Sequence, residues 1–429
     1  MGLFKQSSRI ITIYRIQRLI YFFVSPLIRG VRGVMPKLGI EDLDLKGKKV
    51  LVRVDFNVPI DDNLNITDDI RIRESLPTIK YILSNGGKAI LVSHLGRPDG
   101  KVVEKLRMAP VAKRLEELLG KKIFYVKGCI GEEVKKTISL MKDGDCVLLE
   151  NVRFYKEEEE NDLNFAKSLA QLADIYVNDA FGTAHRAHAS TVGVTKYVPK
   201  SVAGYLMLKE IKYLGDVLAN PKRPFLAILG GAKISSKIDL IKNLLEKVDM
   251  LIIGPAMAYT FFLARGIEVG KSLVEKDKVL VAKEIFKRAI DKNVPLMLPI
   301  DHIVAKSKSE DSESKLVTRV GIPSDWEAVD IGPKTVEKYS HAIKKAKTIL
   351  WNGPLGVFEI KKFSEGTFAI AKLVAESDAV TIVGGGDSAS AIQQSGYADK
   401  IAHISTGGGA SLEFMEGKEL PGISALTNK

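Results

Sequence analysis

Short apolar runs alternate with longer amphipathic stretches along most of this chain, and this pattern constrains its fold more than any other feature. The apolar runs are residues 50–52, 89–92, 146–149, 175–177, 225–229, 250–253, 296–298, 348–351 and 379–383. Between two of them, Pro110 stands at a first-turn position and Gly120 ends a helical pattern. Strand and helix repeated in this order predict parallel sheets with helices on both faces.

The length of 429 residues favours two domains, or three. We therefore expect an α/β protein of two doubly wound, Rossmann-like parallel-sheet lobes. Sheets of this kind bind ligands outside the carboxyl ends of their strands. The residues directly after each apolar run are therefore the candidate functional residues.

The two halves of the chain place different chemistry after their apolar runs. In the first half the sequences are RVDFN at 53–57, SHLGR at 93–97, ENVR at 150–153 and NDAFGTAHR at 178–186. In the second half they are GGAK at 230–233, GP at 254–255, NGPLG at 352–356 and GGGDS at 384–388. Arginine forks bind carboxylate and phosphate oxygens, whereas glycines before a helix let backbone N–H groups approach a polyphosphate. The first half therefore predicts a small acidic substrate, and the second half predicts a nucleotide.

Positive charge is concentrated at the N-terminal end. The formal net charge is +12, and residues 1–34 hold six basic residues and no acid, which leaves 12 − 6 = +6 for the remainder. The apolar run at 19–28 in this segment is shorter than the roughly 20 residues that a bilayer span needs. The segment is a leader, a membrane-surface anchor or the product of an upstream start before Met35, and these alternatives stay open.

Other features exclude some classes or carry no function. Cys129 and Cys146 are the two cysteines, so a disulfide scaffold and a cysteine-rich zinc site are excluded and a reducing compartment fits. His185 and His188 stand three residues apart, which is a weak metal signal. We interpret residues 156–160 (KEEEE) as a solvated loop face and residues 306–315 as an exposed insertion between strands.

Longer motifs resemble the phosphoglycerate kinase family. They are RVDFNVP at 53–59, SHLGRP at 93–98, ENVRF at 150–154, DAFGTAHRAHAS at 179–190, GGAK at 230–233, WNGPLGVFE at 351–359 and GGGDS at 384–388. The resemblance runs in unbroken order from about Leu38 to the C-terminus. It implies reversible phosphoryl transfer from 1,3-bisphosphoglycerate to Mg-ADP, which gives 3-phosphoglycerate and ATP in glycolysis and gluconeogenesis. The activity implied is that of a phosphotransferase with a carboxyl group as acceptor.

The resemblance also implies how the chain is divided. Two lobes face each other across a cleft, with a hinge helix between them. The expected divisions are an N-terminal extension at 1–34, a substrate lobe at 35–205, the hinge helix at 206–219, a nucleotide lobe at 220–405 and a C-terminal segment at 406–429 that returns to the first lobe. Because the two substrates would bind to separate lobes, we expect the lobes to close during the reaction.

Individual residues are carried over by position. The substrate-binding residues implied are Asp55, Phe56, Asn57, Arg71, His94, Leu95, Gly96, Arg97, Arg153 and Arg186. The nucleotide-binding residues implied are Lys237, Asn352, Glu359, Gly385, Gly386, Asp387 and Ser388. The catalytic residues implied are Arg71, Lys233 and Lys237, and Gly407, Gly408 and Gly409 form a glycine loop beside the transfer path. Mg²⁺ is the implied cofactor, linked to Asp387 through the nucleotide.

This set of residues suits phosphoryl transfer. The attacking oxygen is already deprotonated at neutral pH, so the reaction needs positioning and charge neutralisation and no general base. The expected partners are these small molecules and no nucleic acid, with membrane contact only through residues 1–34. We expect a cytoplasmic monomer, with organelle targeting or membrane-surface association through that extension as the alternative.

Three competing classes make different demands on the sequence. An NAD-dependent dehydrogenase needs Gly-x-Gly-x-x-Gly after its first strand, where this chain has Asp55-Phe56-Asn57. A nucleic-acid-binding protein gathers basic and aromatic residues on one face, whereas here the arginines fall singly at strand ends. A family member that acts mainly as a surface-attached binding protein through its tail is the third alternative, and the intact catalytic positions argue against lost activity.

Overall fold

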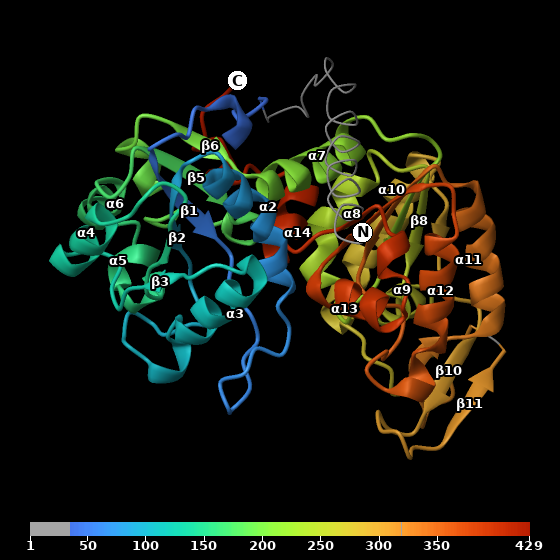
Figure 1. The fold of residues 1–429 in the computed structure, drawn as a ribbon. Helices are drawn as coiled ribbons and strands as arrows, with labels where there is room; N and C mark the ends of the chain where they lie inside the picture. The colour runs from blue at the N-terminus through green and yellow to red at the C-terminus, as the bar shows by residue number, and fades with distance from the viewer. Residues whose placement is uncertain (1–34, 319) are drawn as a thin grey trace, which may run out of the picture.

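The computed structural model describes residues 35–318 and 320–429, so the predictions for residues 1–34 lie outside the described part. Two six-stranded sheets form the framework, in the orders β3-β4-β2-β1-β5-β6 and β15-β14-β13-β7-β8-β9 (Figure 1). Every strand pair in both sheets is parallel. The predicted α/β fold with two parallel-sheet lobes is confirmed.

The first sheet contains the apolar runs of the N-terminal half. Its strands are β1 (Lys49–Val54), β2 (Lys88–Val92), β3 (Phe124–Tyr125), β4 (Cys146–Leu148), β5 (Ile175–Asp179) and β6 (Ser201–Ala203). Its helices include α2 (Ile70–Ser84), α3 (Ala109–Leu119), α4 (Glu132–Ser139), α5 (Lys156–Glu159) and α6 (Leu163–Ala170). Val50 and Val52 belong to one buried cluster and Leu51 to another, because successive side chains of a strand point to opposite faces. Helices therefore cover both faces of this sheet.

Helix α3 follows its sequence signals closely. Pro110 lies in its first turn, where a missing N–H costs nothing. Gly120 follows the helix with a φ of 62°, the left-handed conformation that glycine adopts most readily. The predicted start and stop of this helix are confirmed.

The second sheet repeats the plan. Its strands are β7 (Phe225–Leu229), β8 (Met250–Ile253), β9 (Leu296–Met297), β13 (Thr348–Asn352), β14 (Val380–Gly384) and β15 (His403–Ile404). Its helices include α8 (Ile238–Leu244), α9 (Pro255–Ala264), α10 (Val279–Asp291), α11 (Pro333–Lys345), α12 (Glu365–Ala375) and α13 (Gly386–Gln394). Each apolar run of the C-terminal half overlaps one strand of this sheet.

A small antiparallel sheet departs from the prediction of parallel sheets alone. It consists of β10 (His302–Ala305), β11 (Ser314–Val317) and β12 (Glu327–Ile331), in the order β11-β10-β12. Residues 306–313 connect β10 to β11, and nearly all of them are exposed. The predicted exposed insertion is thus a hairpin loop. Its second strand escaped detection because three of its four residues face solvent and show no apolar run.

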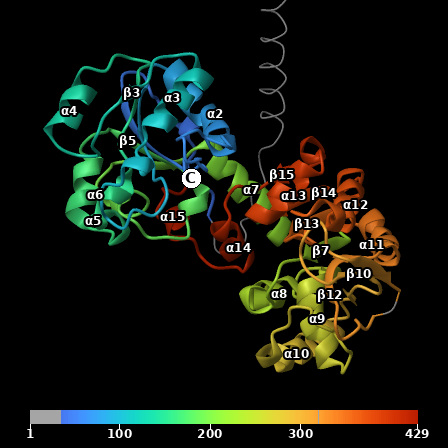
Figure 2. The ribbon, with the colours of Figure 1, turned by 90° about the horizontal axis from the view of Figure 1, so that it is seen from below.

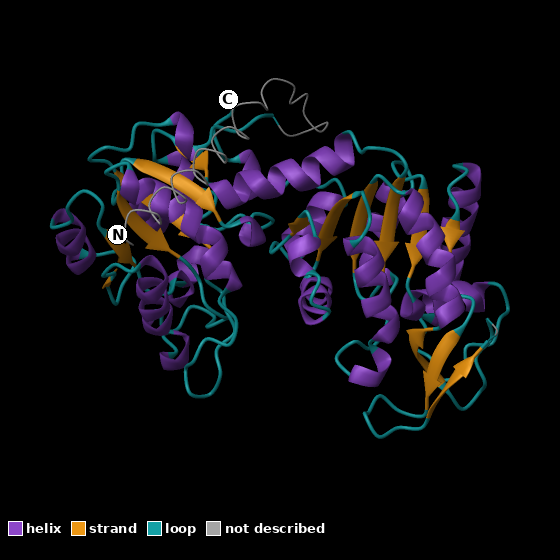
Figure 3. Cartoon of the chain, turned by 45° about the vertical axis from the view of Figure 1, so that its right-hand side comes forward, coloured by secondary structure: helices purple, strands orange, loops and turns teal. Residues whose placement is uncertain are grey.

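The two sheets are joined by a helix and by the end of the chain. Helix α7 (Tyr205–Ala219) runs from the first sheet toward the second (Figure 3). Helices α14 (Gly409–Met415) and α15 (Pro421–Ser424) follow the last strand, and Figure 2 shows α15 beside the first lobe. There the Gly422 amide donates to the Ala184 carbonyl at 2.8 Å, and the Thr427 amide donates to the Ser201 carbonyl at 2.8 Å. These contacts support the predicted return of the C-terminal segment, while the domain boundaries themselves stay predictions.

Within the described ranges, none of the helices combines the length and the apolar character that crossing a bilayer requires.

Candidate active site

The first strand end of the N-terminal lobe is held by its neighbours. Asp55 follows β1, and its Oδ2 atom accepts a hydrogen bond from Arg71 Nη1 on α2 at 2.6 Å. The Phe56 amide donates to Ser93 Oγ, directly after β2, at 2.9 Å. The parallel register of β1 and β2 places these two strand ends side by side. The structure therefore brings Asp55, Phe56 and Arg71 together as predicted.

The loop after β2 is fixed from two sides. The Gly96 amide donates to Asn57 Oδ1 at 2.8 Å, and Arg153 Nη1 donates to the Gly96 carbonyl at 3.0 Å. Asn151 forms a pair of hydrogen bonds with Leu95, at 3.2 Å from the Leu95 amide and 2.7 Å to its carbonyl. Loops that follow three different strands thus share one network.

Buried positive charge gathers at this edge. Arg153 is 6% exposed, and burial lowers its pKa, with the charges of Arg53 and Arg186 acting in the same direction against that of Glu159. Glu159 Oε1 lies 3.2 Å from Arg153 Nε, yet without the alignment of a hydrogen bond, so this buried Nε has no hydrogen-bond partner in the described structure. A buried guanidinium in this state favours an anion beside it.

The remaining predicted side chains on this side differ in their surroundings. Arg186 is half-buried, and its Nε atom donates to His185 Nε2 at 3.2 Å. Arg97 is exposed, and its side chain makes no hydrogen bond or ion pair with the described residues. His94 is 4% exposed, and its Nδ1 atom lies 3.3 Å from Arg53 Nη2. The structure gathers His94 and Arg153 closely and leaves Arg97 at the rim.

Lys237 joins two strand ends of the second sheet. Its Nζ atom donates to the Gly230 carbonyl after β7 at 2.6 Å and to the Asn352 carbonyl at the end of β13 at 2.9 Å. Burial lowers the pKa of Lys237 to about 8, against an opposing effect of the Asp387 carboxylate. A Cβ on Gly230 would lie 1.9 Å from the Pro354 carbonyl oxygen, so only glycine fits this approach.

The turn between β14 and α13 is built around Gly385. Its φ is 95°, and an added Cβ would lie 2.9 Å from Asn352 Nδ2. Asn352 Nδ2 donates to the Gly384 carbonyl at 2.7 Å, and the Gly353 amide donates to Ser388 Oγ at 2.5 Å. The turn therefore positions the N-terminus of α13, whose free N–H groups and dipole favour an anion.

Other predicted residues of the nucleotide side are exposed. Lys233, Glu359 and Asp387 are exposed, and a Cβ on Gly386 would have no neighbour within 4 Å. The side chains of Lys233 and Glu359 have no hydrogen-bond or ion-pair partner in the described ranges. The structure thus gathers Lys237, Asn352, Gly385 and Ser388, and leaves Lys233 and Glu359 unconnected to them by any such bond.

The glycine loop at 407–409 lies against the first lobe. A Cβ on Gly407 would lie 2.4 Å from Phe181 Cδ1, and one on Gly409 would lie 3.6 Å from His185 Nε2. Nearby, a Cβ on Gly182 would lie 2.5 Å from Asp55 Oδ2 and 3.7 Å from the Thr406 carbonyl oxygen. This loop therefore borders the Asp55 side of the substrate residues.

Helix α7 makes a buried contact that sequence reasoning does not reveal. Glu210 is fully buried, and its two oxygens accept hydrogen bonds from His403 Nε2 at 2.9 Å and from the Thr406 amide at 3.0 Å. Tyr213 stacks on the His403 ring with centroids 4.7 Å apart. Glu210 thus links the connecting helix to the segment that precedes the glycine loop. Glu210 and His403 lie in no phosphate or arginine motif, so no signal points to them.

Two further residues, Arg53 and Glu158, are buried in a way that was not predicted from the sequence. Arg53 is visible in the sequence only as the first letter of RVDFN, and it is fully buried beneath the substrate residues. The interpretation of residues 156–160 as a solvated loop face is wrong in two respects, because most of the segment forms helix α5 and the Glu158 side chain is fully buried. An acidic run of four residues gives no indication that one member is enclosed by distant chain segments.

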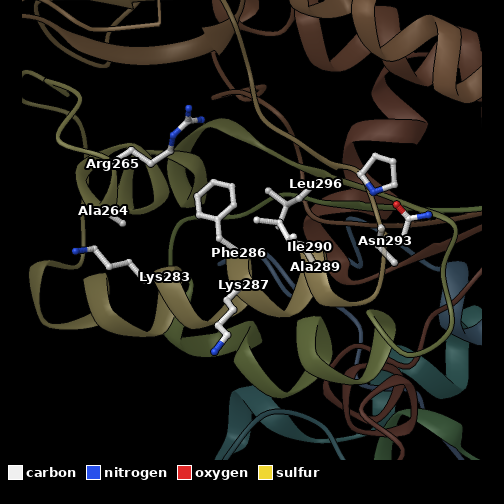
Figure 4. A pocket seen from close by; sticks show the side chains of 11 residues that line it. Ala264, Arg265, Lys283, Phe286, Lys287, Ala289, Ile290, Asn293 and Leu296 are labelled. Carbon is white, nitrogen blue, oxygen red and sulfur yellow. The ribbon is translucent and has the colours of Figure 1, made fainter.

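A hollow of about 800 Å³ lies away from all of these residues, between the end of α9, helix α10 and strand β9 (Figure 4). Phe286, Ile290 and Leu296 line its apolar part. Strand β9 is the edge of the second sheet, three strands away from β13. None of the candidate site residues lines this hollow.

The two-lobed α/β fold, with arginine side chains at the strand ends of one lobe and glycine-lined turns at those of the other, suits a phosphotransferase. A model of the family described as "Phosphoglycerate kinase" matches residues 40–418. The chain therefore belongs to the phosphoglycerate kinase family, and it is a kinase whose phosphoryl acceptor group is a carboxyl group.

Relatives and solved structures agree with this assignment. A phosphoglycerate kinase of Clostridium tetani is 57% identical over 395 residues, covering 92% of this chain and 98% of its own. One of Chloroherpeton thalassium is 55% identical over 397 residues, covering 92% of this chain and 100% of its own. The structure of phosphoglycerate kinase from Coxiella burnetii is 43% identical and superposes with a TM-score of 0.83, covering 91% of this chain and 98% of that chain.

Proposed function

We propose that this chain catalyses reversible phosphoryl transfer from 1,3-bisphosphoglycerate to ADP, giving 3-phosphoglycerate and ATP, with one substrate on each lobe. The observation that carries the proposal is the division of the site. Buried Arg153, whose Nε has no hydrogen-bond partner in the described structure, follows β4 of the first sheet, and buried Lys237 follows β7 of the second. Family membership supports the reaction, and this division supports the residue roles.

On the first lobe, the proposed substrate residues would hold the glycerate and its phosphate. Asp55 and Asn57 provide acceptor oxygens for a hydroxyl group, although Asp55 already accepts two hydrogen bonds and Asn57 accepts one. Arg97, Arg153 and Arg186 provide guanidinium donors of the kind that bind phosphate bidentately. Arg71 stands beside Asp55 and is 30% exposed in its side chain, so it can reach a group that lies between the lobes.

On the second lobe, the proposed nucleotide residues act on the phosphates through backbone and lysine donors. The N-terminus of α13 stabilises negative charge, and Lys237 brings a buried ammonium group. Because charge spreads over the oxygens of the moving phosphoryl group, donors that are already in place lower the barrier. Lys233 is exposed and unpaired within the described structure, so it is free to turn toward the same group.

The donor chemistry fits a magnesium ion carried by the nucleotide. Asp387 presents an exposed carboxylate in the first turn of α13, beside the proposed phosphate site. Mg²⁺ prefers oxygen ligands and is commonly bound by one or two carboxylates together with substrate phosphates. When bound, it would neutralise charge on the phosphate oxygens, and Asp387 would hold it.

The transfer also requires that the two lobes approach. The proposed phosphoryl donor and acceptor bind to different sheets, and helix α7 and the C-terminal segment connect these sheets. We include lobe closure in the proposal, with the segment at 206–219 as the hinge. Closing the lobes would also exclude water, which protects an acyl phosphate from hydrolysis.

A coupled assay tests the proposed function. Purified full chain is mixed with 1,3-bisphosphoglycerate and Mg-ADP, and ATP formation is followed through a linked enzyme, with each substrate omitted in turn and with magnesium removed by a chelator. We expect ATP only when all components are present. Absence of ATP from folded protein would overturn the proposal.

For the setting of the enzyme, we propose a cytoplasmic monomer in which residues 1–34 make any membrane contact. Sedimentation of the purified chain tests the monomer, with a dimer as the contradicting result. Mass spectrometry of the native N-terminus shows whether residues 1–34 are retained in the mature protein.

A further inference from the structure

Arg53 lies at the end of β1, next to the proposed substrate residue His94, and each nitrogen of its guanidinium contacts a protein group. Nε donates to Ser190 Oγ at 2.8 Å, Nη1 donates to the Val54 carbonyl, and Nη2 lies 3.3 Å from His94 Nδ1. Its exposed fraction is 0%. Arg53 therefore cannot bind a ligand as the more accessible arginines of the site can.

The buried carboxylate of Glu158 balances the charge of Arg53 through Ser190. Glu158 is also fully buried, and its oxygens accept hydrogen bonds from Ser190 Oγ at 2.6 Å and from the Ser190 amide at 2.8 Å. Burial raises the pKa of Glu158, whereas the charge of Arg53 and the bonds from Ser190 lower it. Ser190 thus stands between a buried cation and a buried anion and fixes their geometry.

This arrangement determines the protonation of the His94 ring. A guanidinium has donors and no acceptor, so the nitrogen facing Arg53 Nη2 must accept. The accepting atom is Nδ1, which places the single proton of a neutral ring on Nε2. None of the residues in the described structure makes a hydrogen bond with His94 Nε2.

The charged groups around His94 favour the neutral ring. Burial lowers its pKa well below the usual value, and the charges of Arg53, Arg153, Arg71 and His188 lower it further. The nearest carboxylate oxygen is Asp55 Oδ1, 3.9 Å from Nδ1, and Asp55 is itself paired with Arg71. Three arginine cations, on β1, on α2 and in the turn after β4, therefore oppose protonation, and the nearby Asp55 carboxylate is already paired with Arg71.

We propose that Arg53 is a positioning residue that holds His94 as its Nε2–H tautomer, so that this nitrogen donates one hydrogen bond to an anionic oxygen of the bound phosphoglycerate. Ser190 and Glu158 hold Arg53 in place for this purpose. The role of the substrate as acceptor rests on the proposed function. The tautomer and its dependence on Arg53 rest on geometry alone.

The first readout is the ring itself. Full-length protein labelled with ¹⁵N-histidine is studied without ligand by long-range ¹H–¹⁵N spectra, and His94→Gln identifies the His94 signals. We expect the Nε2–H tautomer throughout about pH 5.5 to about pH 8, the range in which an ordinary imidazole titrates. An Nδ1–H tautomer, or protonation within that range, would overturn the proposal.

The second readout compares variants. In Arg53→Gln, and in Ser190→Ala should the first variant fail to fold, the His94 signals should show mixed tautomers. Arg223→Gln is the matched control, because this arginine is exposed, lies in the other lobe and is paired with Asp249. Unchanged His94 signals in a folded Arg53→Gln or Ser190→Ala variant would contradict the proposal.

The third readout is kinetic and separates positioning from a merely structural role. Loss of one hydrogen bond to a charged oxygen should raise KM for 3-phosphoglycerate by roughly tenfold to a hundredfold, with KM for ATP unchanged. Equal changes in both KM values would indicate general disruption and contradict the proposal. An inactive wild type with the predicted tautomer would count against the proposed function and leave the Arg53 assignment standing.

Discussion

Part of the positive charge of the proposed site comes from two buried and two exposed side chains. Arg153 and Lys237 are buried and held by backbone carbonyls, whereas Arg97 and Lys233 are exposed and free of partners in the described chain. The buried pair is already in place before a ligand arrives. The exposed pair can move with the ligand, which suits residues that act on a group in transfer.

Arg71 and Lys233 should each be needed for turnover. Arg71→Ala and Lys233→Ala are expected to lower kcat by on the order of 10² or more, the effect of losing one donor that stabilises the transition state. Arg73→Ala is the control for Arg71→Ala, because Arg73 lies on the same helix, α2, and forms a surface ion pair. Lys242→Ala is the control for Lys233→Ala, because Lys242 lies on α8, the α-helix that follows Lys233, and also forms a surface ion pair. Turnover at the wild-type rate in the coupled assay would exclude the two catalytic assignments.

Lys237 should give the enzyme an alkaline pH limit. Its pKa is lowered to about 8 by burial, so the free enzyme loses this charge as the pH rises through about 8. We expect kcat/KM for Mg-ATP to fall above that pH, since kcat/KM reports groups of the free enzyme. Anionic phosphates stabilise the ammonium group, so kcat should fall only at higher pH. A flat kcat/KM up to about pH 10, near the ordinary pKa of lysine, would contradict the role of Lys237.

The same shift has a defined effect on stability. The pKa of Lys237 is lower in the folded state than the ordinary value of 10.5. The free energy of folding is therefore less favourable at every pH at which this lysine is charged in the unfolded chain. The penalty is complete below about pH 8 and disappears as the pH rises to about 10.5. This group therefore makes the folded state relatively more stable at alkaline pH.

Sequence reasoning identifies the residues at the strand ends but not the residues that hold them. Parallel strands end at one edge, so the order of the motifs is enough to assign Asp55, His94 and Arg153 to one place. The chain of contacts from Arg53 through Ser190 to Glu158 was not predictable, because a buried ion pair depends on which segments enclose it. From the sequence alone an acidic run predicts a solvated face, and the burial of one of its members becomes visible only in the tertiary contacts.

Among the helices and strands, the repeated strand–turn–helix units were predictable from the sequence, whereas the antiparallel strand and the buried contact of the connecting helix were not. Apolar runs predicted nine strands of the two parallel sheets but missed the short edge strands β3, β6 and β15, and Pro110 and Gly120 predicted the ends of α3. The antiparallel strand β11 has mostly exposed residues, so its pairing with β10 left no mark on the sequence. Helix α7 was predicted as a connection, whereas its buried Glu210 was not.

The turn after β14 should be needed for nucleotide binding. Gly385→Ala places a methyl group 2.9 Å from Asn352 Nδ2 on a backbone with a φ of 95°. We expect a higher KM for ATP and an unchanged KM for 3-phosphoglycerate. Gly396→Ala is the control for backbone strain alone, since Gly396 has a φ of 77° and no neighbour within 4 Å of an added Cβ. Equal KM values for ATP in the two variants would contradict the role of this turn.

The buried contact of α7 should stabilise the fold. Glu210→Ala leaves His403 Nε2 and the Thr406 amide without their acceptor, and each buried donor that loses its partner costs about 1 to 3 kcal/mol. Urea unfolding should show this loss. Lys209→Ala, which removes a surface ion pair with Glu74, is expected to stay within about 0.5 kcal/mol of the wild type. A similarly small effect of Glu210→Ala would show that this contact does not hold the helix.

At the scale of the whole molecule, the sequence predicted two lobes of different chemistry, and the structure shows them as two parallel sheets (Figure 3). Motifs assign each residue to a sheet, but they carry no information about the distance between the sheets, because few contacts cross from one to the other. Helix α7 and the returning C-terminal segment are the connections along which the lobes would move.

Small-angle X-ray scattering tests most directly the central claim that two substrates on separate lobes react after the lobes close. The full chain is measured alone, with 3-phosphoglycerate, with Mg-ATP, and with a non-reacting pair of both ligands. The account predicts a smaller radius of gyration with both ligands bound and none of this compaction with either alone. An unchanged radius of gyration with both sites saturated would contradict it.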